Sequence, residues 1–166
     1  GRSDYGIWRP ILKSISAFKK YKCKIIITGS HFSKKFGYSY SEIVVDNYCK
    51  RILADIGNLY DKDSPEYSAK ISSKISYHLS IILSKQKFDV ILLLGDRFEM
   101  ATAALTIIPF KIPIIHFHGG SITTGSFDDN YRHAITKLSN FHMVETNKNK
   151  KRIIQMGENK KNIKVI

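Results

Sequence analysis

The chain has 166 residues, of which 43% are hydrophobic and 25% charged, the composition of a soluble globular protein with a hydrophobic core. It contains no run of eighteen apolar residues, so a membrane-spanning helix is not expected. The net charge of +13 would suit a polyanionic partner, but aromatic residues do not alternate with the basic ones. We therefore expect a lysine-rich surface and no nucleic-acid site.

The beginning of the chain and its cysteines predict a cytoplasmic location. Residues 1–10 lack the apolar segment of a signal peptide. Cys23 and Cys49 are too few for a disulfide framework and lack metal-type spacing. Because the chain has no initiator Met and ends on the apolar run "NIKVI", we also expect it to be cut from a longer protein.

The first half of the chain predicts helices around a short buried strand. Apolar residues recur at helical spacing over 5–21, and the run "CKIIITG" (23–29) predicts a strand. Residues 30–42 predict a loop, and 42–60 are ambiguous between elements, with a short helix followed by a strand as one solution. "DSPE" (63–66) predicts the start of a helix that continues to about residue 85. The apolar face of that helix would also suit a dimer.

The second half alternates strongly apolar strands with helices. Strands are predicted over 88–96, 112–119, 141–146 and 163–166, and helices over 97–108, 128–140 and 148–157. Strands that are apolar throughout are typical of a parallel sheet buried on both faces. The sequence thus predicts an α/β domain around a parallel sheet.

Glycine, hydroxyl, acidic and basic residues gather where the predicted strands end, in "TGSHFS", "GDRFE" and "HGGS…DD". Open α/β sheets bind ligands at the carboxyl ends of their strands, and this mixture is typical of a site for a phosphorylated ligand.

Each of these residues also has a purely structural interpretation. Asp96 could cap the helix that follows it, and Asp128 and Asp129 could be first-turn acids favoured by the helix dipole. Arg132 could be the intrahelical partner of Asp128.

A metal site is a further alternative. Its ligands would be drawn from His116, His118, Asp128 and His133. The predicted strand that carries the first two is otherwise apolar and no cysteine joins the set, so we expect no metal.

The motifs "GDRFE", "HGGSITTGSFDD" and "RHAITKLSNFHMVET…IIQMGE" resemble those of the hydrolysing UDP-N-acetylglucosamine 2-epimerases, enzymes of sialic- and legionaminic-acid-type sugar synthesis. The resemblance covers almost the whole chain. It implies a GT-B-like fold with two Rossmann-like halves, of which residues 1–166 would be the N-terminal one. The opening strand would precede Gly1 and the second half would follow Ile166.

The resemblance also implies a reaction. Family members eliminate the nucleotide across C1 and C2 of the sugar and then add water, which yields the free 2-epimer without a metal or cofactor. The substrate would be UDP-N-acetylglucosamine or a UDP- or GDP-linked diacetamido-trideoxyhexose, and the full-length enzyme would be a homo-oligomer, a dimer or tetramer. The implied catalytic residues are Asp96, His118, Asp128 and Arg132, and the implied substrate-binding residues are Arg2, Asp4, Arg97, Ser121 and His133.

One departure from the family pattern concerns the proton acceptor. Where sialic-acid-type relatives read "HIEGGE" or "HIHGGE", this chain reads "HFHGGS", so His118 and Ser121 stand at positions that carry Glu in relatives. Either His118 or Asp128 would then take the C2 proton, since imidazole is an effective base near neutral pH. Alternatives to the epimerase are a GT-B-type glycosyltransferase domain and a non-catalytic polyanion-binding module. The fragment alone is expected to be inactive.

Overall fold

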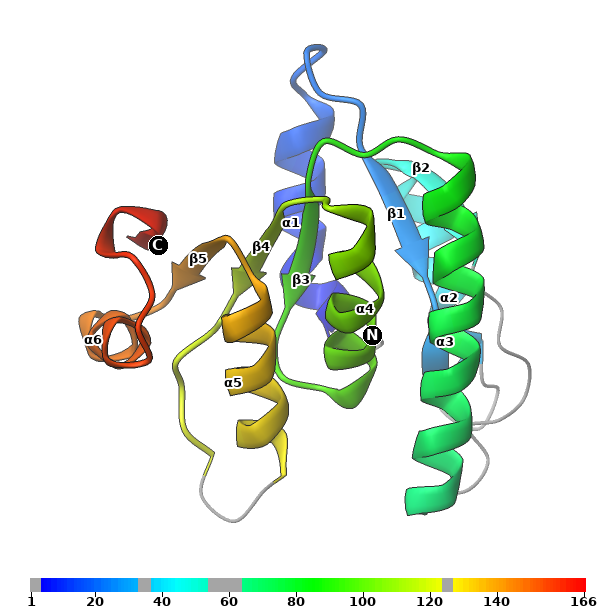
Figure 1. The fold of residues 1–166 in the computed structure, drawn as a ribbon. Coiled ribbons are helices and arrows are strands. Elements are labelled where there is room, and N and C mark those ends of the chain that lie inside the picture. Colours follow the sequence, from blue (N-terminus) through cyan, green and yellow to red (C-terminus); the bar gives the residue numbers. More distant parts are fainter. Residues whose placement is uncertain (1–3, 33–36, 54–63, 124–126) are drawn as a thin grey trace. The chain divides into compact units, whose positions relative to one another are not determined.

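The computed structural model describes residues 4–32, 37–53, 64–123 and 127–166. The chain divides into two compact units, Gly1–His78 and Leu79–Ile166. All strand pairs in the described ranges are parallel, and hydrogen bonding groups them into two sheets, β1–β2 and β3–β4–β5–β6, where the sequence predicts one (Figure 1). The predicted α/β class, with parallel strands flanked by helices, is confirmed.

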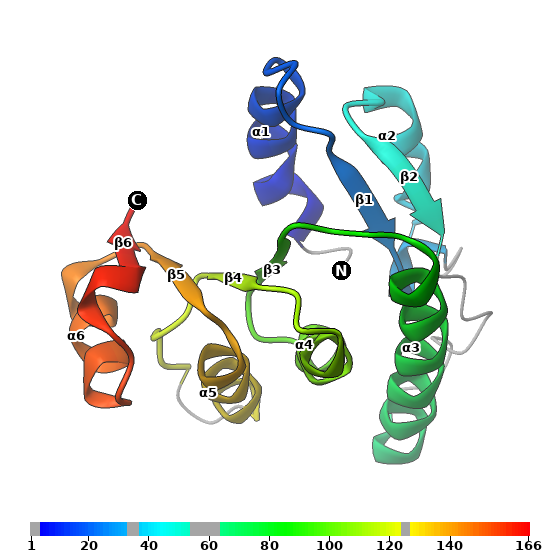
Figure 2. The ribbon, with the colours of Figure 1, turned by 45° about the horizontal axis from the view of Figure 1, so that its top comes forward.

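The first unit is built around a two-stranded sheet. Its elements are α1 (Tyr5–Ser16), β1 (Lys24–Ile27), η2 (Gly29–Phe32), α2 (Tyr40–Asp46) and β2 (Lys50–Leu53). Helices α1 and α2 flank the strands (Figure 2), and their apolar residues meet in a core of Tyr5, Leu12, Ile27, Ile43 and Cys49. The described part of the ambiguous segment, up to residue 53, is therefore a helix followed by a strand. Helix α1 ends at Ser16, earlier than predicted, because 17–23 turn toward β1.

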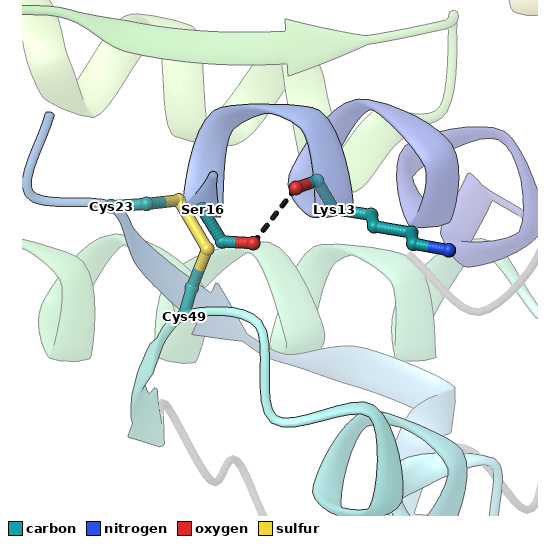
Figure 3. Close-up of a disulfide and its surroundings, with 4 residues drawn as sticks. All are labelled: Lys13, Ser16, Cys23 and Cys49. Atoms are coloured by element: carbon teal, nitrogen blue, oxygen red, sulfur yellow. Dashed lines mark hydrogen bonds between the residues drawn. A yellow bond between two sulfur atoms is a disulfide. The ribbon is translucent and has the colours of Figure 1, made fainter. Parts of the chain in front are cut away.

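Cys23 and Cys49 form a disulfide, which corrects the expectation that the two cysteines build no disulfide framework (Figure 3). They directly precede Lys24 and Lys50, which are partners in the parallel register of β1 and β2. Their Cα atoms are therefore only 5.2 Å apart despite a sequence separation of 26. Cys49 belongs to the buried core of the first unit, and the partly buried Cys23 packs against that core. The last turn of α1 is closed by Ser16 Oγ, which donates to the Lys13 carbonyl at 2.8 Å.

Helix α3 (Pro65–Lys85) begins with a serine cap. Ser64 Oγ accepts a hydrogen bond from the backbone N–H of Tyr67 at 3.3 Å, and Pro65 occupies the first helical position. The sequence assigns the cap to Asp63, which lies outside the described residues. The apolar face of α3 is buried within the chain, so it does not provide the dimer surface suggested above; it consists of Ile71, Ile75, Leu79, Ile82 and Leu83.

The second unit repeats strand and helix in strict alternation. Its elements are β3 (Ile91–Leu94), α4 (Phe98–Ile107), η5 (Ile108–Phe110), β4 (Ile114–Phe117), α5 (Asp128–Leu138), β5 (Phe141–Val144), α6 (Asn147–Gln155), η6 (Lys160–Asn162) and β6 (Ile163–Val165). The strands pair in chain order, β3–β4–β5–β6. Helices α4 and α5 lie side by side along one face of this sheet (Figure 2).

The core of the second unit follows from the apolar strand pattern. Ile114 and Val144 on the strands are fully buried, as are Ile135 on α5 and Ile153 on α6. Because β3, β4 and β5 are parallel neighbours, their carboxyl ends meet at one edge of the sheet. That edge carries the polar residues described below.

Among the described residues, no helix combines the length and the apolar character that crossing a lipid bilayer requires.

Candidate active site

Three neighbouring strands each end in a titratable or glycine-rich turn. Gly95 and Asp96 follow β3, His118 follows β4, and Glu145 follows β5. Backbone hydrogen bonds between neighbouring strands hold these ends close to one another. Gly95 N–H donates to the Phe117 carbonyl at 3.0 Å, and His118 N–H donates to the Met143 carbonyl at 2.9 Å. The strand ends therefore place Asp96, His118 and Glu145 along one edge, in the order of their strands.

Arg132 of α5 joins Asp96 to the segment that follows the glycine turn. The residue is only 5% exposed. Nη2 donates to Asp96 Oδ2 and, at 3.0 Å, to Thr123 Oγ1. Nη1 donates to the Ser121 carbonyl at 2.9 Å and to Asp129 Oδ1 at 2.5 Å. The five-donor guanidinium thus holds four acceptors from three segments of the chain.

The electrostatic setting of Arg132 is a balance between burial and nearby acids. Burial lowers the pKa of Arg132 from its ordinary value, while the charge of Glu145 acts in the opposite direction. Asp129 also accepts from the backbone N–H of Thr123 at 2.9 Å. The segment 121–123 is therefore fastened to α5 through both its carbonyl and its amide groups.

His116 supports the turn that carries Asp96. It is fully buried on β4, its Nε2 lies 2.8 Å from the Gly95 carbonyl, and its Nδ1 lies 3.2 Å from Thr136 Oγ1. A carbonyl only accepts, so Nε2 carries the proton. Burial lowers the pKa of His116 to about 4, which keeps its imidazole neutral. His116 is therefore a structural histidine that fixes Gly95 immediately before Asp96.

His118 has an unusual backbone and an acidic neighbour. Its φ of +64° lies in the left-handed region, where a non-glycine residue is strained and often functional. Its Nδ1 lies 3.3 Å from Glu145 Oε1, and its side chain is 30% exposed. The imidazole is thus held at the sheet edge by a carboxylate and remains open to a ligand.

Glu145 is itself held by α6. Asn149, which is buried, donates from Nδ2 to Glu145 Oε2 at 2.9 Å and to Ser121 Oγ at 3.0 Å. Arg152 on the same helix donates to the Gly120 carbonyl. Helix α6 therefore connects the strand end at Glu145 to the turn that precedes Ser121.

The glycine pair after His118 is required by close packing. A Cβ at Gly119 would lie 2.9 Å from His116 Nδ1. Gly120 has a φ of +78°, and a Cβ there would lie 2.6 Å from the Asn149 carbonyl oxygen and 2.9 Å from Ile153 Cγ1. Only glycine lets the turn approach α6 this closely.

Of the remaining predicted site residues, one lies outside the described residues and the others have surroundings of their own. Arg2 is not among the described residues. Asp4 lies in the first unit, buried directly before α1. Arg97 donates to the buried carboxylate of Glu99, with Nε 3.1 Å from Oε2. Asp128 begins α5 and is partly exposed.

His133 and His118, two further histidines of the proposed metal set, have different surroundings. His133 follows Arg132 on α5, and its Nδ1 is buried without a hydrogen-bond partner among the described residues. His118 lies past the end of β4, so it does not share a strand face with His116 as a His-x-His metal pair would require. Both ring nitrogens of His116 are engaged by Gly95 and Thr136.

Sequence reasoning did not assign Glu145 or Asn149 to the site, and it considered Asp129 only as an acid in the first turn of a helix. The rule that selected Asp96 and His118, a titratable residue directly after a strand, also selects Glu145. Asp129 lies three residues before Arg132, a spacing that helical geometry favours as readily as four. Asn149 offers no comparable signal, because its contact with Ser121 spans 28 residues of sequence.

The arrangement is suited to proton transfer on a ligand bound at the sheet edge. Asp96 and His118 are partly exposed, with side chains 27% and 30% accessible, whereas Arg132, the partner of Asp96, is buried. A carboxylate held by a buried arginine and an imidazole next to a second carboxylate are groups that general acid–base catalysis uses near neutral pH. The fixed cation of Arg132 favours negative charge at the same place.

Comparison with known proteins assigns this architecture. The family model of UDP-N-acetylglucosamine 2-epimerases matches residues 13–166. The UDP-N,N'-diacetylbacillosamine 2-epimerase (hydrolyzing) of Legionella pneumophila is 36% identical over 164 residues, covering 98% of this chain and 42% of the relative. A GDP/UDP-N,N'-diacetylbacillosamine 2-epimerase (hydrolyzing) of Campylobacter jejuni is 33% identical, covering 98% and 41%.

Solved structures agree in fold. The UDP-GlcNAc 2-epimerase of Neisseria meningitidis bound to UDP-GlcNAc superposes with a TM-score of 0.82 at 20% identity, covering 99% of this chain and 43% of that one. This chain spans less than half the length of the relatives it matches. Match and architecture together show that the chain belongs to the UDP-N-acetylglucosamine 2-epimerase family.

Proposed function

We propose that residues 1–166 form the N-terminal Rossmann-like domain of a hydrolysing nucleotide-sugar 2-epimerase. The protein converts a UDP- or GDP-linked N-acetylated amino sugar into the free 2-epimer and a nucleoside diphosphate. The observation that carries this proposal is the position of Asp96 and His118 at adjacent strand ends, with Asp96 paired to the buried Arg132, in a chain of this family.

The proposed roles follow from exposure and contacts. His118 takes the proton from C2, since it is the partly exposed imidazole of the cluster. Asp96 and Asp128 handle protons at the leaving oxygen and at the added water. Arg132 stabilises negative charge that develops near Asp96, and the remaining residues bind substrate: Arg2, Asp4, Arg97, Ser121 and His133. No metal or cofactor takes part in this proposal.

The sugar we favour is a diacetamido-trideoxyhexose of the bacillosamine type. The Legionella and Campylobacter relatives, whose names specify N,N'-diacetylbacillosamine, are 36% and 33% identical. The UDP-N-acetylglucosamine 2-epimerase of Neisseria meningitidis is 31% identical. UDP-N-acetylglucosamine is thus the second substrate to test, and a sialic- or legionaminic-acid-type pathway would use either product.

The proposal extends to the setting in which the enzyme works. The catalytic cleft would be completed by a second Rossmann-like half, so residues 1–166 alone would not turn over substrate. The complete enzyme would act as a homo-oligomer in the cytoplasm.

The test uses the longer protein that carries this chain, incubated in D2O with UDP-N,N'-diacetylbacillosamine, its GDP analogue or UDP-N-acetylglucosamine, and followed by proton NMR. The expected result is release of the nucleoside diphosphate together with the free 2-epimer, deuterated at C2. Deuterium at C2 reports proton removal and return through a glycal intermediate.

Two results would contradict the proposal. Transfer of the sugar to an acceptor without deuterium at C2 would identify a glycosyltransferase. Absence of nucleotide release from all three substrates would contradict the epimerase proposal.

A further inference from the structure

We propose that Glu145 is a positioning residue for His118: it fixes the Nδ1–H tautomer of the imidazole, so that Nε2 faces the sugar as the proton acceptor. The inference rests on the proposed function for its catalytic part, while its structural part concerns residues 118, 145 and 149 alone. Glu145 was not among the residues that the sequence or the resemblance assigned to the site.

The first step is the geometry of the pair. Glu145 Oε1 lies 3.3 Å from His118 Nδ1, at the ends of the adjacent strands β5 and β4. A carboxylate only accepts, so a hydrogen bond at this position requires the proton on Nδ1. The other ring nitrogen, Nε2, then has a free lone pair.

The second step is that Glu145 is itself oriented. Asn149 Nδ2 donates to Glu145 Oε2 at 2.9 Å, and Asn149 is only 8% exposed. Because one oxygen is held by Asn149, the other is directed to His118. A base that is oriented by a second group, which is oriented by a third, is the arrangement by which enzymes fix a proton acceptor.

The third step is the strained backbone of His118. The residue adopts a φ of +64°, and its N–H is fixed to the Met143 carbonyl at 2.9 Å. This conformation is unfavourable for a residue with a Cβ, so surrounding contacts must maintain it. The contact with Glu145 restrains the His118 side chain, and the hydrogen bond to Met143 restrains its backbone.

In the proposed step the bond between C2 and its hydrogen breaks, and the proton passes to Nε2 of His118. The electron pair of that bond forms the C1–C2 double bond, while the C1–O bond breaks and its electrons leave with the nucleoside diphosphate. The resulting imidazolium is stabilised by the negative charge of Glu145. On hydration, water adds its oxygen to C1 and loses one proton, while a solvent-derived proton is delivered to the opposite face of C2, which gives the 2-epimer.

The structural part is tested in residues 1–166 with 15N-labelled histidine, by long-range proton–nitrogen NMR, with the His118 signals assigned from a His118→Asn variant. In the wild type, Nδ1 should carry the proton and Nε2 should show the shift of an unprotonated nitrogen. Glu145→Ala should move the proton to Nε2, whereas Glu145→Gln, which retains an acceptor, should preserve the Nδ1–H form. An unchanged His118 spectrum in Glu145→Ala would overturn the pairing.

The catalytic part is tested in the longer protein with the substrate that the wild type turns over. Glu145→Ala should lower kcat at least about tenfold with little change in KM, and should slow C2 deuteration equally. Glu145→Asp should recover part of the loss. Glu66→Ala on α3 is the matched control, since this exposed glutamate pairs only with Lys70 in the described contacts.

The two failures are distinguishable. If the wild type turns over substrate but Glu145→Ala retains full kcat, Glu145 does not act on catalysis. If the wild type turns over none of the substrates, the proposed function fails and the catalytic part fails with it, whatever the tautomer of His118.

Discussion

Arg132, buried on α5, donates to the carboxylate of Asp96 at the end of β3, across 36 residues of sequence. The same guanidinium holds Ser121, Thr123 and Asp129. A single cation therefore fixes the strand end, the glycine-rich segment and the start of the following helix relative to one another.

Replacing Arg132 with lysine should disturb stability and activity together. The compact ammonium of lysine cannot reach four acceptors in the plane of a guanidinium, so Asp96 and the Ser121 carbonyl lose donors in a buried setting. We expect a loss of about 3 kcal/mol in the free energy of unfolding of residues 1–166, measured by urea denaturation. In the longer protein, turnover should fall about a hundredfold.

The matched control is Lys70→Met, which breaks the exposed pair of Glu66 and Lys70 on α3. It should leave the urea midpoint unchanged, because exposed ion pairs contribute little. An Arg132→Lys variant as stable as this control would show that the four contacts of the guanidinium are dispensable.

Gly120→Ala should destabilise the second unit. The left-handed φ of +78° disfavours a side chain, and the new Cβ would lie 2.6 Å from the Asn149 carbonyl oxygen. We expect a loss of about 2 kcal/mol in thermal or urea denaturation. Gly6→Ala is the control: a Cβ at Gly6, within α1, meets no atom within 4 Å. That change should be neutral or stabilising by up to about 1 kcal/mol. Equal effects of the two substitutions would contradict the packing described for the turn.

Stability should fall as the pH drops below about 6.5. Burial lowers the pKa of His116 to about 4, and burial also lowers that of His142. Between pH 6.5 and 4 the unfolded chain therefore binds protons that the folded chain does not, so acidification favours unfolding. His116 alone contributes roughly 3 kcal/mol over this interval.

The measurement is urea denaturation of residues 1–166 at intervals between pH 7.5 and 4.5, above the range in which most carboxylates titrate. His116→Gln, folded or partly destabilised, should show a shallower dependence on pH than the wild type. A free energy of unfolding that stays constant from pH 7 to 5 would refute the neutral, buried state of His116.

Reduction of the Cys23–Cys49 disulfide should weaken the first unit. A cross-link over 26 residues restricts the unfolded chain and contributes about 3 kcal/mol. Oxidised residues 1–166 should therefore unfold at lower urea concentration once dithiothreitol is added, while a Cys23→Ser/Cys49→Ser variant should be indifferent to it. Two reactive thiols per chain, counted under denaturing conditions without reductant after air oxidation, would contradict the bridge.

The elements that the sequence predicted best are those of the second unit. Runs such as "ILLL" and "IIHF" are too apolar for anything but buried strands, and the acids at 128 and 129 mark the start of α5. The rule that ligands bind at strand ends then selected Asp96 and His118 without any structure.

The features that were missed depend on contacts between distant segments. The pairing of Cys23 with Cys49 follows from the register of β1 and β2, which no local pattern specifies. The hydrogen bond from Asn149 to Glu145 requires α6 to lie against the strand end. The burial of the α3 apolar face depends on residues outside the helix, which the helix sequence alone does not predict.

The disulfide has a consequence for how β1 and β2 find each other. A pair of four-residue parallel strands has few hydrogen bonds to define its alignment, and a shift by one residue would turn each side chain to the opposite face. Because Cys23 and Cys49 stand directly before Lys24 and Lys50, only the native alignment brings the two sulfur atoms together. In the oxidised chain the disulfide therefore selects the native register. Strands that pair out of register cannot form the disulfide, and once it has formed the register cannot shift.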